Sequence, residues 1–301
     1  MRFATVVVDG TEQGCVRRQD GRWAPLHRLD PSLAGDLLTL IEQSAARDLL
    51  DPIAQGAEAL GERELVEAGE ATYRPPYRRP RKIWGIGLNY ADHAGDLHEE
   101  TPSQPASFIK ADHTIVGPGD EIVIPHQSER TTGEGELGVV MGREASNVPP
   151  DQALDHVFGV CAVLDQTAED ILALNPRYLT RSKNFPTFFS FGPEVVTLDE
   201  FLRSRALEDV EVATFLDGAE VRRNVVGNMT HAPRDLISFH SQMMPLFPGD
   251  IISTGTPGAG VLKPGVVAEA RVEGLLPLTN PVRDDAARQD PGPRPARRSA
   301  D

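Results

Sequence analysis

The chain has 301 residues, an apolar fraction of 40% and a formal net charge of −15 at pH 7. A chain of this length can bury a full hydrophobic core, in one large domain or in two smaller ones. The acidic balance argues against a nucleic-acid backbone or an anionic membrane surface as a partner, because both carry negative charge themselves.

Cysteine content and hydropathy narrow the class of protein further. The two cysteines, Cys15 and Cys161, are too few for a disulfide framework or a cysteine-based zinc site. We expect Cys15 to face solvent at a strand edge and Cys161 to lie in the core. No apolar run approaches membrane-spanning length. The apolar run among the first residues is shorter than the apolar part of a signal peptide. The sequence therefore predicts a cytoplasmic protein.

Residues 1–76 are predicted to form a small N-terminal module that contains both strands and helices. Asp9-Gly10 and Asp20-Gly21 are typical hairpin turns between apolar segments. The predicted elements are strands at 3–8, 14–18 and 22–26 and helices at 33–50 and 57–68. The basic, proline-rich stretch 74–80 is predicted to be a stiff linker.

Residues 77–283 are predicted to form a second, larger domain. Short apolar segments with glycine-containing turns predict strands at 82–88, 107–110, 121–125, 136–141, 160–164, 210–216, 250–253 and 266–272. Helices are fewer and are expected at 151–156 and 233–242. This pattern favours an α+β, β-rich fold with a mixed β-roll or barrel over a doubly wound sheet. The tail, 284–301, has no large apolar side chain and is predicted to be disordered.

Three carboxylates lie in segments that otherwise have the composition of buried strands: Glu134, Glu136 and Asp165. Glu134 and Glu136 are two residues apart, so in a strand they face the same side. Two carboxylates on one face repel each other unless a cation lies between them, and a carboxylate is rarely buried without a cationic partner. Oxygen ligands suit a hard cation, so the predicted cofactor is Mg²⁺, with Mn²⁺ or Ca²⁺ as alternatives.

A histidine and two lysines are candidates for chemistry beside such a metal. His93 and Asp96 are three residues apart and would share a helix face, where the carboxylate can orient the imidazole as a base for water. Taken alone, this pair also fits an ordinary surface helix. Lys110 and Lys183 in isolation would be solvated surface residues. Next to a metal, their ammonium groups could hold a substrate carboxylate or a developing enolate.

A glycine-rich loop at 254–260 follows the predicted strand 250–253. It lacks the Gly-Lys-Ser/Thr ending of a phosphate-binding loop. Its backbone N–H groups and the hydroxyl of Thr256 could hold a carboxylate, and the alternative is a tight turn.

Eight short stretches together resemble the fumarylacetoacetate hydrolase family. They occur in the family's order and are GLNYADH (87–93), FIK (108–110), GPGD (117–120), EGEL (134–137), DQTA (165–168), KNF (183–185), FGP (191–193) and TGTP (254–257). The resemblance implies a β-rich, usually dimeric enzyme with a bound Mg²⁺ or Mn²⁺ ion. Longer members also carry an N-terminal module. Most members cleave a C–C bond beside a carbonyl in acylpyruvates or related diketo acids.

By position, the metal ligands that the resemblance implies are Glu134, Glu136 and Asp165. His93 then matches the base that activates water, with Asp96 to orient it. Lys183 matches the residue that stabilises charge on the substrate. The further residues expected to contact the substrate are Tyr90, Lys110, Arg181, Gly255 and Thr256.

Three positions depart from the family's usual pattern. Asp96 stands where Glu is usual, Glu169 where Arg is usual, and Pro186 where Asp is usual. With Glu169 in place of the usual arginine, the chain lacks a cation that would bind a substrate carboxylate there. Arg177 and Arg181 are the candidates to bind that carboxylate instead. Because these changes surround the substrate rather than the metal, we expect the metal chemistry to be kept and the substrate to be unusual.

The predicted function is metal-dependent hydrolysis of a C–C bond in a 2-oxo acid by a cytoplasmic homodimer. Water activated by His93 would attack a carbonyl, and the metal and Lys183 would stabilise the enolate that leaves. A decarboxylase or tautomerase of an oxaloacetate-like acid would use the same enolate stabilisation without that water, and a hydratase or lyase is a further alternative. The alternative of a different class is a non-catalytic binding protein that keeps the fold.

Overall fold

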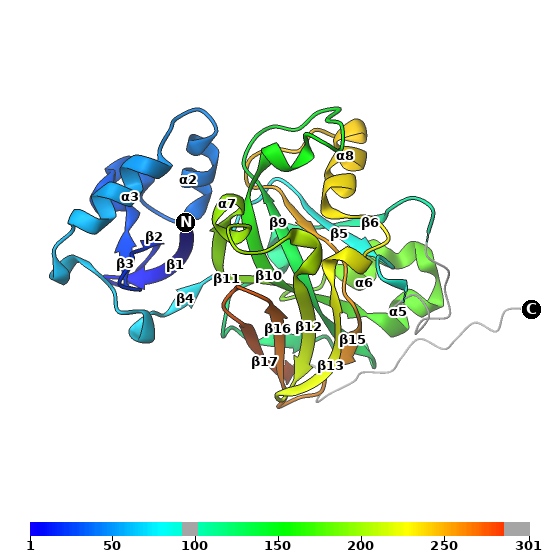
Figure 1. Cartoon of the computed structure of the whole chain (residues 1–301). Coiled ribbons are helices and arrows are strands. Elements are labelled where there is room, and N and C mark those ends of the chain that lie inside the picture. Colours follow the sequence, from blue (N-terminus) through cyan, green and yellow to red (C-terminus); the bar gives the residue numbers. More distant parts are fainter. Residues whose placement is uncertain (92–101, 286–301) are drawn as a thin grey trace, which may run out of the picture.

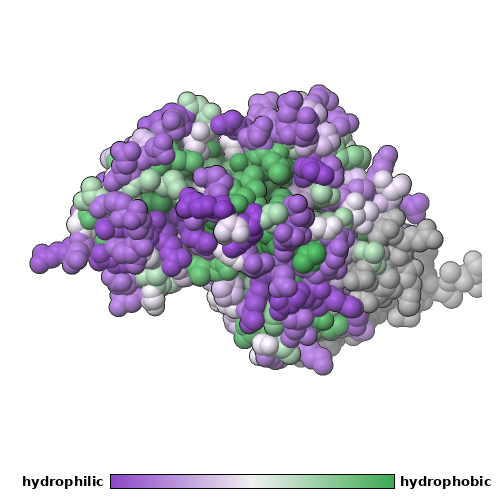
Figure 2. All heavy atoms as spheres, viewed as in Figure 1, coloured by the Kyte–Doolittle hydropathy of each residue, from purple (hydrophilic) through white to green (hydrophobic). Residues whose placement is uncertain are grey.

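The computed structural model describes residues 1–91 and 102–285 (Figure 1). Two β-sheets and several short helices give a mixed α+β, β-rich fold, as predicted. From residue 286 onward the predicted disordered tail lies outside the described residues. No helix in the described ranges is long and apolar enough to span a membrane. Hydrophilic residues cover most of the face in Figure 2, in keeping with the high net charge.

The larger sheet has twelve strands, in the order β3-β2-β1-β11-β10-β9-β14-β5-β6, with β4, β7 and β15 paired to β1, β11 and β9. Its strands are β1 Arg2–Val8, β2 Thr11–Arg17, β3 Trp23–Pro25, β4 Tyr73–Arg74, β5 Ile83–Gly87, β6 Ala106–Lys110, β7 Ile115–Val116, β9 Thr131–Met141, β10 Val157–Ala168, β11 Phe189–Thr197, β14 Ile251–Ser253 and β15 Ala259–Val261. Because β1 pairs with β11, the first strands of the chain extend the sheet that carries the acidic residues.

The smaller sheet has five strands in the order β13-β12-β16-β17-β8. Its strands are β8 Ile122–Ile124, β12 Glu211–Leu216, β13 Ala219–Val225, β16 Val267–Val272 and β17 Leu278–Asp284. The α-helices are α1 Leu26–Leu29, α2 Leu37–Ser44, α3 Leu50–Ala59, α5 Glu169–Leu174, α6 Leu179–Lys183, α7 Leu198–Phe201 and α8 Pro233–Met243. In the part of the chain that the structure describes, each sheet keeps two end strands, so neither closes into the barrel considered from the sequence.

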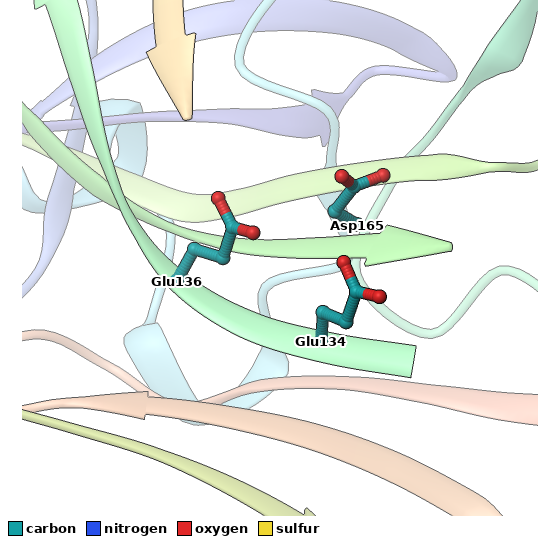
Figure 3. A group of neighbouring side chains, drawn as sticks. All are labelled: Glu134, Glu136 and Asp165. Carbon is teal, nitrogen blue, oxygen red and sulfur yellow. The ribbon is translucent and has the colours of Figure 1, made fainter. Parts of the chain in front are cut away.

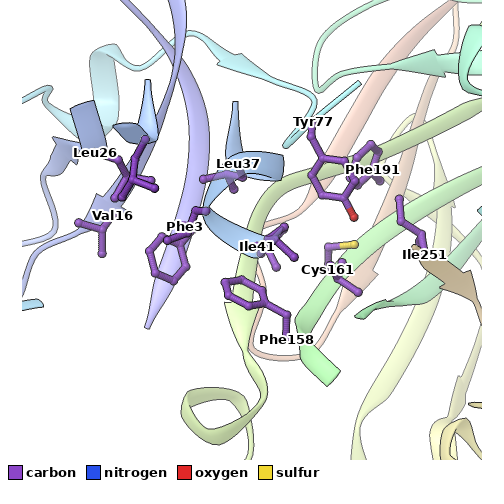
Figure 4. Packing of buried hydrophobic residues seen from close by; sticks show 14 of the residues in the cluster. Phe3, Val16, Leu26, Leu37, Ile41, Tyr77, Phe158, Cys161, Phe191 and Ile251 are labelled. Carbon is purple, nitrogen blue, oxygen red and sulfur yellow. The ribbon is translucent and has the colours of Figure 1, made fainter. Parts of the chain in front are cut away.

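A hydrophobic core joins the N-terminal elements to the larger sheet (Figure 4). Phe3 and Ile41 pack in one cluster with Phe158 and Phe191. Tyr77, within the predicted linker, is fully buried, and its ring centroid lies 5.1 Å from that of Phe191. Burying side chains of this size contributes about 1.5–3 kcal/mol each. The division of the chain into domains at residues 76 and 77 stays a proposal.

A second core fills the space between the two sheets. Leu137 and Leu164, from β9 and β10, pack in one cluster with Val212, Ala270 and Leu278 of the smaller sheet. The strands that carry the acidic residues are therefore covered by the smaller sheet on this side, which fixes their position.

The N-terminal helices differ from those predicted. The expected helix at 33–50 is wrong as one element, because α2 ends at Ser44, whose hydroxyl bonds back to the carbonyls of Leu40 and Ile41. The chain continues as α3 at Leu50, inside the predicted range. The helix expected at 57–68 is wrong, because Leu60 turns to an extended conformation and packs against the core. Core packing has thus overridden helical periodicity at Leu60, and local hydrogen bonding accompanies the end of α2 at Ser44.

Several strands also differ from expectation. The strand predicted at 136–141 begins at Thr131, and the strand predicted at 160–164 extends to Ala168, so the acidic residues lie inside strands. Strand β11 was not predicted, because Gly192-Pro193 interrupts its sequence, and proline is unusual within a strand. Cys15 is fully buried rather than at an exposed edge, because β2 lies between β1 and β3. Cys161 lies in the core as expected.

Candidate functional site

Three buried carboxylates meet on neighbouring strands of the larger sheet (Figure 3). Glu134 and Glu136 come from β9 and Asp165 comes from β10, where it is the direct cross-strand partner of Glu134. One carboxylate oxygen from each residue lies within 4.8 Å of the other two. The three residues are 6%, 1% and 1% exposed. The pairing of β9 with β10 thus brings Asp165 to the face that the E-x-E spacing defines.

Two buried lysines neutralise part of this charge. Lys183, at the end of α6, donates to Glu134 Oε2 at 3.0 Å and to Asp165 Oδ2 at 2.8 Å. Lys110, at the end of β6, pairs with Asp165 Oδ1 and donates to two backbone carbonyls. An ammonium group has three N–H donors. Within the described residues, Lys110 therefore uses all three and Lys183 uses two.

Hydroxyl and backbone donors hold the two glutamates. Glu136 Oε2 accepts from Ser253 Oγ at 2.5 Å and from the Gly255 N–H at 2.9 Å. Glu134 Oε1 accepts from Thr167 Oγ1 at 2.9 Å. Neither Ser253 nor Thr167 was predicted from the sequence to belong to the site. The available signal was a hydroxyl residue in a buried strand, close to an acidic residue that needs a donor.

Burial sets the electrostatics of the cluster. Burial, followed by the charges of Asp165 and Glu134, raises the pKa of Glu136 to about 8. Burial lowers the pKa of Lys110 to about 8, against the attraction of Asp165. Burial also acts to lower the pKa of Lys183, but the charges of Asp165 and Glu134 outweigh it and raise that pKa. With Glu136 protonated, the two remaining carboxylates match the two ammonium groups, and ionisation of Glu136 adds a third negative charge to the cluster.

The donor set fits a hard divalent cation. Three carboxylates offer only oxygen ligands, which suit Mg²⁺, Mn²⁺ or Ca²⁺ better than metals that prefer sulfur or imidazole. A cation beside Glu136 would also lower the pKa of this residue and keep all three carboxylates ionised. The buried cluster is therefore a candidate metal centre.

The other site residues predicted from the sequence differ from one another in burial and in their contacts. Tyr90 is fully buried, and burial followed by the charge of Glu136 raises the pKa of its phenol. The hydroxyl of Thr256 donates to a carbonyl two residues later, at 3.0 Å, as in a tight turn. Arg181 is exposed on α6 and makes no described contact with the three carboxylates. His93 and Asp96 lie outside the described residues.

Glu169, one of the positions that depart from the family's pattern, is paired with a basic residue. Its carboxylate lies 2.5 Å from Arg130 Nε, and its backbone N–H donates to the Arg130 carbonyl at 2.9 Å. Arg177 and Arg181, considered from the sequence as replacements for the missing arginine at the substrate, stay predictions. The start of β9 pairs with the end of β10, and this places residue 130 beside residue 169.

Comparison with known proteins identifies the family. The model of the fumarylacetoacetate (FAA) hydrolase C-terminal family matches residues 82–283, which include the three carboxylates and both lysines. The chain belongs to the fumarylacetoacetate hydrolase family. The fold is thus that of a known enzyme family, and the buried acidic cluster lies within the matched residues.

Individual relatives extend this result to nearly the whole chain. Oxaloacetate tautomerase FAHD2A, mitochondrial, of Homo sapiens is 32% identical over 291 residues, covering 94% of this chain and 90% of the relative. A putative HpcE protein from Mycobacterium smegmatis has a TM-score of 0.82 at 28% identity, covering 94% and 99% of the two chains. A 2-hydroxyhepta-2,4-diene-1,7-dioate isomerase from Mycobacterium marinum has a TM-score of 0.73 at 25% identity, covering 95% and 99%. The family and these relatives support an enzyme that processes 2-oxo acids.

Proposed function

We propose that this protein is a metal-dependent tautomerase that interconverts the enol and keto forms of a dicarboxylic 2-oxo acid such as oxaloacetate. The observation that carries the proposal is the similarity to human oxaloacetate tautomerase FAHD2A, over 94% of this chain and 90% of the relative. The Mycobacterium marinum isomerase supports the same class of reaction, because its 2-hydroxy-2,4-diene dioate is itself the enol of a dicarboxylic 2-oxo acid.

In this proposal, Glu134, Glu136 and Asp165 hold a divalent cation, Mg²⁺ or Mn²⁺. When bound, the cation would act as a Lewis acid and stabilise negative charge on the 2-oxo oxygen of the substrate. Lys183 stabilises the same enolate through the N–H that Glu134 and Asp165 leave free. Lys110 donates all its N–H groups within the described residues, so its part is to hold Asp165 in place.

Tautomerisation moves one proton and releases no fragment. A base takes the proton from the enol hydroxyl, and a proton is added to the neighbouring carbon to give the ketone. We propose His93, oriented by Asp96, as the base. Tyr90, Arg181, Gly255 and Thr256 stay proposed substrate contacts, with the exposed Arg181 as the candidate for a substrate carboxylate.

Hydrolysis of a C–C bond, the function first predicted from the sequence, is the second candidate. It is favoured by His93, which matches the family's water-activating base. It requires the same enolate stabilisation by the cation and Lys183, and differs in the attacking water. Decarboxylation and hydration share this chemistry, but among the relatives described above the printed activities are a tautomerase and an isomerase.

A substrate panel read by product identity tests the proposal. With Mg²⁺ or Mn²⁺, we expect the enol of oxaloacetate to disappear faster, followed by its ultraviolet absorption, with the keto acid as the sole product. Two acid fragments from an acylpyruvate would instead assign hydrolysis, and CO₂ with pyruvate would assign decarboxylation. Turnover that stops with a chelator and returns with Mg²⁺ would exclude a non-catalytic protein.

The assembly and the compartment remain proposals. We propose a homodimer, the assembly that the family resemblance implies. Light scattering on the full chain would give a single-chain mass if this is wrong. The human relative has "mitochondrial" in its name, so it gives no support to the cytoplasmic location predicted from the sequence.

A further inference from the structure

A single peptide group links Glu136 to a buried asparagine. The N–H of Gly255 donates to Glu136 Oε2 at 2.9 Å. The carbonyl of Thr254, on the other side of the same peptide bond, accepts from Asn89 Nδ2 at 2.8 Å. Because the peptide group is planar, fixing the direction of its carbonyl also fixes the direction of its N–H. The position of Asn89 is thereby transmitted to Glu136.

The side chain of Asn89 is itself held on both sides of its amide. Its Nδ2 also donates to the carbonyl of His231 at 3.0 Å, and its Oδ1 accepts from the N–H of His231 at 2.9 Å. The residue is 1% exposed. A buried amide whose donors and acceptor are all engaged has one favoured orientation, because rotation would leave polar groups unpaired in a low dielectric.

Close packing adds to this hydrogen bonding. Gly255 has φ +99°, a conformation that L side chains rarely adopt. A Cβ at this position would lie 2.8 Å from the Cβ of Asn89 and 3.1 Å from the carbonyl oxygen of Ile86. The loop therefore lies close against Asn89, and a residue larger than glycine would not fit at position 255.

We propose that Asn89 is a positioning residue of the metal centre, which orients the Thr254–Gly255 peptide group so that this group holds Glu136 Oε2. The proposal rests on the proposed metal-dependent function and extends it to a residue that hydrogen-bonds to none of the three carboxylates in the described structure. Partners that orient metal ligands typically affect metal affinity by about 10–100-fold. A purely structural role for Asn89 would affect stability and leave metal affinity unchanged.

Asn280 provides a matched control. It lies on β17 in the smaller sheet, is fully buried, and donates through Nδ2 to two backbone carbonyls at 2.7 and 2.8 Å. No described hydrogen bond connects it to the three carboxylates. Replacing Asn280 with alanine therefore removes a comparable buried amide without reaching the metal centre.

Titration calorimetry of the full chain with Mn²⁺ tests the proposal. We expect Asn89→Ala to weaken Mn²⁺ binding by about 10-fold or more. We expect Asn280→Ala to lower the Tm while the Mn²⁺ affinity stays at the wild-type value. Equal affinities for wild type and Asn89→Ala, or equal losses in both variants, would overturn the proposal.

Amide hydrogen exchange on the metal-free protein gives an independent readout. The Gly255 N–H should exchange faster in Asn89→Ala than in wild type or Asn280→Ala. If Asn89→Ala does not fold, the milder Asn89→Ser serves for both measurements. Unchanged exchange at Gly255 would overturn the inference. A wild-type chain that binds no Mn²⁺ would overturn the proposed function instead, and the exchange rate would still decide whether Asn89 holds the loop.

Discussion

Two regions of the protein bury carboxylates in different ways. Asp250 is fully buried and has one cation, with Lys82 Nζ at 2.6 Å, and its two oxygens also accept N–H groups from Lys82 and Phe247. On β9 and β10, by contrast, three carboxylates share two ammonium groups. The Asp250 pair is complete within the protein, whereas the three-carboxylate cluster matches its two lysines only while Glu136 keeps its proton. A third buried carboxylate that a bound cation would ionise, rather than burial alone, distinguishes a candidate cation site from a structural ion pair.

The largest expected effect comes from removing a charge from the cluster, with a buried ion pair elsewhere in the protein as the control. Glu134→Gln should abolish Mn²⁺ binding and turnover while the fold persists, because it replaces a charged carboxylate by a neutral amide, a much weaker ligand. Glu194→Gln is the matched variant, since Glu194 is a fully buried carboxylate paired with Arg2 at 2.6 Å. It should keep Mn²⁺ affinity and turnover. Titration calorimetry measures the Mn²⁺ affinity of both variants, and product formation measures their turnover. Full activity in Glu134→Gln would show that the site is assigned wrongly.

Replacing the lysine of each region sharpens the comparison. Lys183→Met should lower turnover by about 100–1000-fold, because it removes a donor aimed at the developing enolate. Lys82→Met removes the partner of Asp250 and should destabilise the fold by about 3–5 kcal/mol with turnover unchanged. Steady-state kinetics and denaturant unfolding of the two variants separate these effects. A Lys183→Met enzyme with wild-type turnover would contradict the proposed role of this ammonium.

The smallest effect concerns the proton on Glu136. In the metal-free protein, burial raises the pKa of this carboxyl from 4.5 to about 8. The folded carboxyl keeps its proton up to about pH 8 while the unfolded one loses it near pH 4.5. The folded state therefore binds more protons between these values, and metal-free stability should fall as pH rises from 4.5 to about 8. Mn²⁺ binding at pH 7 should accordingly release about one proton.

Two measurements test whether Glu136 carries this proton in the metal-free protein. Calorimetry in buffers with different ionisation enthalpies counts the protons released on Mn²⁺ binding, and thermal unfolding of the metal-free protein follows stability against pH. Glu136→Gln is the control for unfolding and should lose this part of the pH dependence. Binding at pH 7 without proton release would show that Glu136 is already ionised in the metal-free cluster.

Local sequence rules predicted the parts of the structure that depend on neighbouring residues. Alternation along a strand placed Glu134 and Glu136 on one face, and both lie buried on β9. Asp9-Gly10 and Asp20-Gly21 marked turns between strands that the structure contains. The helix predicted at 33–50 was wrong as one element, because α2 ends at Ser44, whose hydroxyl bonds back to the carbonyls of Leu40 and Ile41.

The amino-acid sequence by itself thus predicted the family, the candidate oxygen ligands and the face on which two of them lie, since these depend on residue types and short spacings. Only the tertiary structure decided which basic and polar residues contact these carboxylates. Strand pairing brings Arg130 beside Glu169, and the packing of α6 brings Lys183 to Glu134 and Asp165. Asn89 likewise reaches Glu136 through a peptide group 165 residues further along the chain. These contacts join segments far apart in the sequence, so short spacings do not contain them.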